Sequence, residues 1–135
     1  MNALNMILKL REWEEELEKQ KFIGILTERQ RMEGYLRELE ERFRSVGFLK
    51  ESNSMELLSI YNEMQYLLTR LKEAQEIMQK IDEELQAQRQ IYEEAFKERK
   101  KIEQLYDRLI NTIKMQRQKL EEKLISDVFI SRLRS

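Results

Sequence analysis

The chain has 135 residues, of which 38% are charged, and it contains no proline and only three glycines. So few turn-forming residues argue against a compact globular core and favour long, continuous helices. Because the chain has no cysteine and no histidine, thiol nucleophiles, disulfides, Cys/His zinc sites and imidazole bases are excluded.

The net charge of −1 conceals an uneven distribution along the sequence. Residues 50–96 carry five basic and ten acidic residues, a net charge of −5. Residues 97–135 carry eleven basic and six acidic residues, a net charge of +5. The carboxyl-terminal part of the predicted helical rod is therefore basic.

The first ten residues contain a short apolar run that is interrupted by Lys9 and followed by Arg11. This run is too short for a signal peptide or a membrane span. Its spacing is typical of the first turns of an amphipathic helix. We therefore expect a cytoplasmic protein with no direct membrane insertion.

A first long helix is predicted over residues 3–46, because two series of mostly apolar residues recur there at heptad spacing. The two series are Phe22, Arg29, Leu36 and Phe43, and Ile25, Met32, Leu39 and Val46. Upstream, Leu10, Trp13 and Leu17 fall in a different register. A slip in the heptad phase is therefore expected between Leu17 and Phe22, where the coil would loosen.

A loop between the two predicted helices is expected at residues 47–53. Gly47 is suited to end the first helix. Asn53 and Glu56 have the spacing of a capping box, which predicts a helix that begins at residue 54. Two helices joined by so short a loop run antiparallel, so the prediction is a helical hairpin.

The second helix, predicted over residues 54–130, carries the longest heptad pattern. Its position a series is Leu57, Met64, Leu71, Met78, Leu85, Tyr92, Arg99, Tyr106, Ile113 and Leu120. Its position d series is Ile60, Leu67, Ala74, Ile81, Gln88, Ala95, Ile102, Leu109, Gln116 and Lys123. A stripe with this spacing stays in line only when the helix supercoils around a partner. The predicted fold is all-α, a single antiparallel coiled-coil hairpin over residues 1–135 whose second helix is longer than the first.

The unequal lengths predict an overhang. With a turn near residue 50, the first helix would run out opposite about residue 97, so Arg99 would mark the end of the intramolecular core. The overhang would comprise about 35 residues, or about 50 Å at 1.5 Å per residue. Its uncovered stripe would bind a partner, fray, or pair with a second copy.

The sequence offers little chemistry for catalysis. Acidic runs such as Glu14–Glu16 lie on helix surfaces, where no cleft would shift their pKa values, and no Gly-rich phosphate loop occurs. The basic run Lys97–Lys101 is interrupted by an acid and has few aromatics beside it, which disfavours nucleic-acid binding. We expect no enzyme, no cofactor, no metal, no nucleic acid and no small-molecule substrate.

Three stretches of the sequence stand out, and they are residues 94–109 (EAFKERKKIEQLYDRL), 56–75 and 8–12 (LKLRE). Together they resemble the FliJ family of flagellar type III export proteins. Residues 94–109 resemble that family's "ExxKERKxLExLxxR" segment, and residues 56–75 resemble the start of its second helix. Residues 8–12 resemble its amino-terminal "VLxLRE". Near the carboxyl terminus, Asp127 matches an acid of the family pattern, but Val128 replaces the acid that follows it.

The resemblance implies a non-enzymatic role in protein export. FliJ-like proteins are antiparallel two-helix coiled coils that resemble the stalk helices of the rotary ATPase γ subunit. They insert the open end of the hairpin into the hexameric export ATPase, promote its assembly, link it to the membrane export gate protein and contact export chaperones. The implied location is cytoplasmic, with peripheral association with the inner-membrane export apparatus.

The resemblance also implies two groups of partner-facing residues. The candidates for binding the ATPase are Arg99, Lys100, Lys101, Ile102, Tyr106, Arg108, Leu109 and Ile113. The candidates for binding the export gate are Leu67, Leu71, Ala74, Met78, Met32, Leu36, Leu39 and Phe43. The heptad pattern assigns the second group to the intramolecular core, and a coil that opens at this point would reconcile the two interpretations.

Two alternatives remain open from the sequence. One is the equivalent stalk of a virulence type III secretion system, which neighbouring genes would distinguish. The other is a structural coiled coil that homodimerises through its overhang and binds no ATPase.

Overall fold

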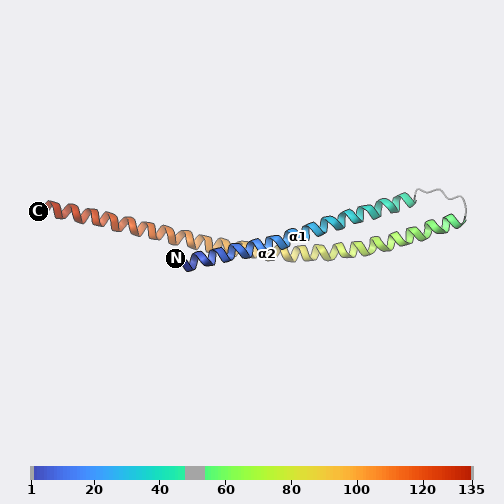
Figure 1. Cartoon of the computed structure of the whole chain (residues 1–135), viewed down its shortest axis with the longest axis horizontal. Coiled ribbons are helices and arrows are strands. Elements are labelled where there is room, and N and C mark those ends of the chain that lie inside the picture. Colours follow the sequence, from blue (N-terminus) through green and yellow to red (C-terminus); the bar gives the residue numbers. More distant parts are fainter. Residues whose placement is uncertain (1, 48–53, 135) are drawn as a thin grey trace. The chain divides into compact units, whose positions relative to one another are not determined.

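Two helices make up the part of the chain that the computed structural model describes, which comprises residues 2–47 and 54–134. Helix α1 spans Asn2–Gly47 and helix α2 spans Ser54–Arg134 (Figure 1), and these ranges contain no strand. The predicted all-α hairpin with a longer second helix is confirmed. The predicted loop and its capping residue Asn53 lie outside the described residues.

The contacts divide the chain into two units. One unit, which we call the hairpin unit, is Leu17–Glu93. The other, which we call the terminal unit, combines α1 up to Glu16 with α2 from Glu94 onward. Each unit is described separately below.

The hairpin unit is held together by an apolar seam between α1 and α2. Leu39, Leu67 and Ala74 are buried at its centre. Side chains packed against them are Met32, Leu36, Phe43, Val46 and Leu71. From Ile60 to Tyr92, every predicted a or d position of α2 is buried or half-buried, so the heptad prediction is confirmed here.

The predicted slip in the heptad phase of α1 is wrong. Upstream of Phe22, half-buried residues continue at the same heptad spacing, and they are Leu4, Leu8, Arg11, Glu15 and Glu18. Leu10, Trp13 and Leu17, on which the predicted slip was based, are exposed. The register is continuous because polar side chains occupy three of the seam positions: Glu15 and Glu18 find partners on α2, and Arg11 pairs with Glu14 on α1.

Glu18 and Gln88 form one of these polar pairs, within the hairpin unit. The Nε2 group of Gln88 donates to the Glu18 carboxylate at 2.5 Å and to the Glu18 backbone carbonyl at 3.2 Å. The hydrogen bond from Gln88 lowers the pKa of Glu18, an effect that partial burial opposes and that Lys21 reinforces. A polar pair at a seam position specifies the helix register, because a shifted register would leave both groups without partners.

Replacing a buried seam residue should destabilise the hairpin far more than replacing its neighbour. Leu67 has 0% of its surface exposed, whereas Leu68 has 44% exposed. We expect Leu67→Ala to lower the free energy of unfolding by about 2–5 kcal/mol, the usual effect of truncating a core leucine. Leu68→Ala should change it by less than about 0.5 kcal/mol. Equal shifts of the two thermal midpoints would show that the seam is assigned to the wrong face.

Glu18 should make the stability of the hairpin sensitive to acid. A carboxyl group with a lowered pKa in the folded state stabilises the fold above its ordinary pKa of about 4.3, and this contribution is lost as the pH falls through the lowered value. Glu18→Gln should therefore lower the thermal midpoint at neutral pH and flatten its decline below about pH 4.3. Glu84→Gln, on an exposed face of α2, serves as the control. If the two variants follow the same pH profile, the Glu18–Gln88 pair has no such role.

Candidate functional site

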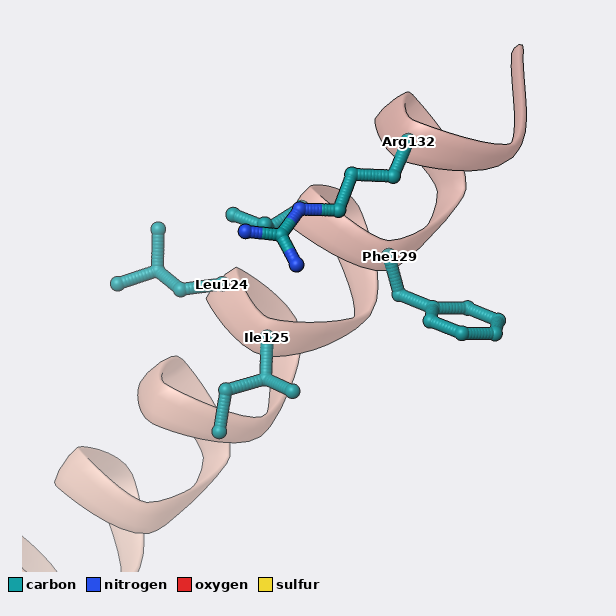
Figure 2. A pocket seen from close by; sticks show the side chains of 5 residues that line it. Leu124, Ile125, Phe129 and Arg132 are labelled. Atoms are coloured by element: carbon teal, nitrogen blue, oxygen red, sulfur yellow. The ribbon is translucent and has the colours of Figure 1, made fainter. Parts of the chain in front are cut away.

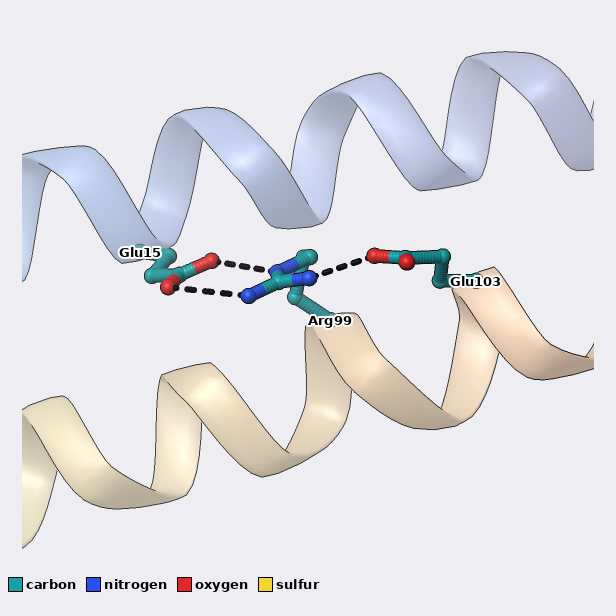
Figure 3. A network of polar contacts seen from close by, with 3 residues as sticks. All are labelled: Glu15, Arg99 and Glu103. Carbon is teal, nitrogen blue, oxygen red and sulfur yellow. Dashed lines mark hydrogen bonds and ion pairs between the residues drawn. The ribbon is translucent and has the colours of Figure 1, made fainter.

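Arg99 forms the main cross-helix contact of the terminal unit. Its Nε donates to Glu15 Oε2 at 2.7 Å, its Nη2 donates to Glu15 Oε1 at 3.4 Å, and its Nη1 pairs with Glu103 (Figure 3). The Arg99 side chain is only 18% exposed. The hydrogen bond that Arg99 donates to Glu15, followed by the one that it donates to Glu103, raises the pKa of Arg99, so the guanidinium remains charged.

The sequence had indicated that Arg99 marks the end of the intramolecular core, and this prediction is wrong. Ile102 and Tyr106, beyond Arg99, are also half-buried. That prediction assumed that the two helices pair directly from the turn onward, with Val46 opposite residue 54. In the hairpin unit, however, Val46 and Ile60 are the half-buried seam positions nearest the turn, and Leu57 is exposed. The stretch of α2 without cover is therefore shorter than predicted and begins after Ile113, because every residue from 114 to 134 is exposed.

The structure separates the eight predicted ATPase-binding residues into two groups. Those exposed are Lys100, Lys101, Arg108 and Leu109. Those half-buried are Arg99, Ile102, Tyr106 and Ile113. The exposed group can contact a partner while the terminal unit keeps its present packing.

The eight predicted gate-binding residues lie in the seam of the hairpin unit. The buried ones are Leu67, Ala74 and Leu39. The half-buried ones are Leu71, Met78, Met32, Leu36 and Phe43. The structure thus agrees with the heptad interpretation of these residues as core, and a partner could reach their apolar surfaces only if the two helices separated.

An exposed apolar face lies near the end of α2, and the heptad pattern identified only one of its members, Leu120. Its members are Leu120, Leu124, Ile125, Val128, Phe129 and Leu133. Five residues line an open hollow on this face, namely Leu124, Ile125, Val128, Phe129 and Arg132. Figure 2 shows Leu124 and Phe129 projecting to different sides of the helix, with Ile125 between them. The signal was available in the sequence, because the apolar residues recur at intervals of four and so follow the 3.6-residue period rather than the heptad.

A second exposed apolar group lies at the start of α2, in the hairpin unit. Met55, Leu58, Tyr61 and Tyr66 are all exposed there. Met55, Leu58 and Tyr66 line an open hollow together with polar neighbours. These residues lie off the a and d positions, so a search restricted to the seam did not find them.

Other classes of site were also sought among residues 2–47 and 54–134. Neither helix contains a stretch long and apolar enough to cross a lipid bilayer. The same residues contain no group of three or more acidic side chains suited to hold a metal ion. Comparisons with family models, curated proteins and solved structures gave no match.

Removing Arg99 should loosen the amino-terminal segment of α1. Arg99→Ala leaves the carboxylate of Glu15, itself 17% exposed, without its cross-helix partner. We expect a loss of about 1–3 kcal/mol, the usual effect of leaving a partly buried charged group unpaired. Hydrogen exchange should become faster around Glu15, whereas Lys100→Ala, at an exposed position, should leave it unchanged. No change in exchange for either variant would show that the ion pair does not hold the segment.

Proposed function

We propose that this chain is the stalk-like coiled coil of a bacterial type III protein export apparatus. In this role it binds the hexameric export ATPase, promotes ATPase assembly, and connects the ATPase to the membrane export gate protein and to export chaperones. The flagellar apparatus is the one we favour, because the three stretches at residues 8–12, 56–75 and 94–109 resemble the flagellar FliJ family. The protein would be cytoplasmic and peripherally associated with the export apparatus.

The observation that carries the proposal is the exposed end of α2. A rod that enters a ring needs one helix end that the rod's own second helix does not cover. In the terminal unit, residues 114–134 are exposed throughout, and the described part of α1 in this unit does not extend alongside the carboxyl-terminal end of α2 (Figure 1). Exposed apolar side chains there supply contact area, and the surrounding basic residues favour an acidic partner.

The proposed ATPase contacts are the exposed members of the predicted set. Lys100, Lys101 and Arg108 would attract an acidic surface, and Leu109 would add apolar contact. Lys101 already pairs with Glu98 at 3.5 Å, but both side chains are at least half exposed, so this ion pair is weak.

The proposed gate contact is the exposed apolar group at the start of α2. Met55, Leu58 and Tyr66 are accessible without any separation of the two helices. They therefore offer an apolar surface toward the hairpin end that does not compete with folding, unlike the seam residues that the resemblance implied.

The ATPase contact can be tested with variants that leave the fold intact. The triple substitution Lys100→Ala, Lys101→Ala, Arg108→Ala should weaken binding to a hexameric export ATPase by about tenfold or more, if each exposed charge contributes about 0.5 kcal/mol. The effect should shrink as the salt concentration rises, because exposed charges are screened. The thermal midpoint should stay nearly unchanged.

The matched control removes two exposed lysines of the hairpin unit, Lys72→Ala and Lys80→Ala, and should bind normally. A wild-type chain that neither binds an export ATPase nor stimulates its assembly would contradict the proposed function. The remaining interpretation would then be the structural coiled coil that binds no ATPase. Binding to the ATPase of a virulence secretion system, but not to a flagellar one, would transfer the role to that apparatus.

A further inference from the structure

The amino-terminal part of α1 has a second apolar face that nothing in the terminal unit covers. Met6, Leu10 and Trp13 recur at intervals of four and three residues, and all three are exposed. We call these three residues the outer stripe. At about 100° per residue they lie roughly opposite the half-buried seam residues Leu8 and Arg11. Helix α1 therefore contacts α2 on one side and presents a heptad-spaced apolar stripe on the other.

Helix α2 has a complementary surface in the same unit, which is half-buried at Ile113 and uncovered beyond it. The seam face that α1 covers at Ile102 and Tyr106 continues through Ile113, Leu120 and Leu124. We call these last three residues the open seam. Ile113 is half-buried, and the other two are exposed. The open seam spans about 17 Å and the outer stripe about 11 Å at 1.5 Å per residue, so one can accommodate the other.

The charges beside the two surfaces have opposite signs. Residues 6–16, which contain the outer stripe, carry two basic and four acidic side chains, a net charge of −2. Residues 113–124, which contain the open seam, carry four basic and two acidic side chains, a net charge of +2. Pairing stripe with stripe or seam with seam would bring like charges together, whereas pairing stripe with seam brings opposite charges together.

We propose that the outer stripe of one copy of this chain covers the open seam of a second copy, and the reverse, in a closed two-fold dimer. Within the terminal unit, α1 begins beside the part of α2 where its cover ends. A two-fold axis near that point would therefore place each open seam along the other copy's outer stripe. Such an interface is isologous and closes after two copies, so it gives a dimer and not a filament.

This inference does not rest on the proposed function. It concerns the chain alone and is measured without an ATPase. Ile113 belongs both to the open seam and to the ATPase-binding candidates, so the dimer and the ATPase would compete if both inferences hold.

Trp13 is the only tryptophan of the chain, which makes it a direct probe of the interface. It is 62% exposed in the single chain. Sedimentation equilibrium of the 135-residue chain should show a monomer–dimer equilibrium, and tryptophan emission should shift to shorter wavelength as the dimer forms. A chain that sediments as a monomer at high micromolar concentration would overturn the proposal.

Single substitutions test whether the dimer forms through the outer stripe. Trp13→Ser should weaken the dimer by about thirtyfold, the loss expected for an aromatic anchor of about 2 kcal/mol. Ile77→Ser alters an exposed apolar residue in the hairpin unit and should leave the dimer unchanged. Circular dichroism should show the same helicity for both variants. A dimer that tolerates Trp13→Ser would overturn the proposed arrangement.

Charge reversal tests the pairing of stripe with seam. Replacing Glu12, Glu14 and Glu16 by Lys should weaken the dimer, as should replacing Arg117, Lys119 and Lys123 by Glu. The chain with all six changes should dimerise again, because each flank then meets the opposite charge in the other copy. If the sixfold variant stays monomeric while it remains helical, the two surfaces do not face each other.

Discussion

The structure depends on burying a narrow apolar stripe that a single helix cannot bury by itself. A chain with 38% charged residues and no proline forms long helices readily but has no globular core in which to hide its apolar side chains. Leu39 and Leu67 are buried only because α1 and α2 share one seam. The other features of the structure depend on where α1 covers the apolar stripe of α2 and where this cover ends.

The seam changes its chemistry along α1. In the hairpin unit it is mainly apolar, and side chains such as Phe22 and Tyr92, whose ring centroids lie 6.1 Å apart, pack across it. In the terminal unit, Arg11 and Glu15 occupy seam positions, and Arg99 faces Glu15. At partly buried positions, the cost of removing two charges from water offsets much of their attraction. Such ion pairs therefore define the helix register more than they add stability. The hairpin unit should therefore be the more stable of the two, and the segment up to Glu16 should open first.

Two groups of exposed apolar residues lie in the terminal unit, one beyond the covered part of α2 and one on the face of α1 opposite the seam. The carboxyl-terminal part of α2 exposes Leu124 and Phe129, and the amino-terminal part of α1 exposes Leu10 and Trp13. A chain this rich in charge could have placed polar residues at these positions at little cost in helix stability. Their apolar character agrees with the two proposals above, in which these surfaces contact another chain, and the basic charge of residues 97–135 and the acidic flank of the outer stripe bias which surfaces can meet.

The sequence alone determined the elements, their order, and the seam face of α1 from Phe22 onward and of α2 up to Tyr106. The heptad spacing from Ile60 to Tyr106 predicts which α2 positions are covered, because period and burial are tied by helix geometry. Only the tertiary structure decided how far the cover extends and which polar residues belong to the seam. The sequence pattern placed Glu15 on a helix surface and did not single out Glu18. A glutamate is buried only beside a specific partner, and the partners Arg99 and Gln88 lie seventy or more residues away along the chain. The heptad period can be read from residues that are neighbours in sequence. The pairing of one polar side chain with another depends instead on the register of α1 against α2, and no local sequence pattern contains that register.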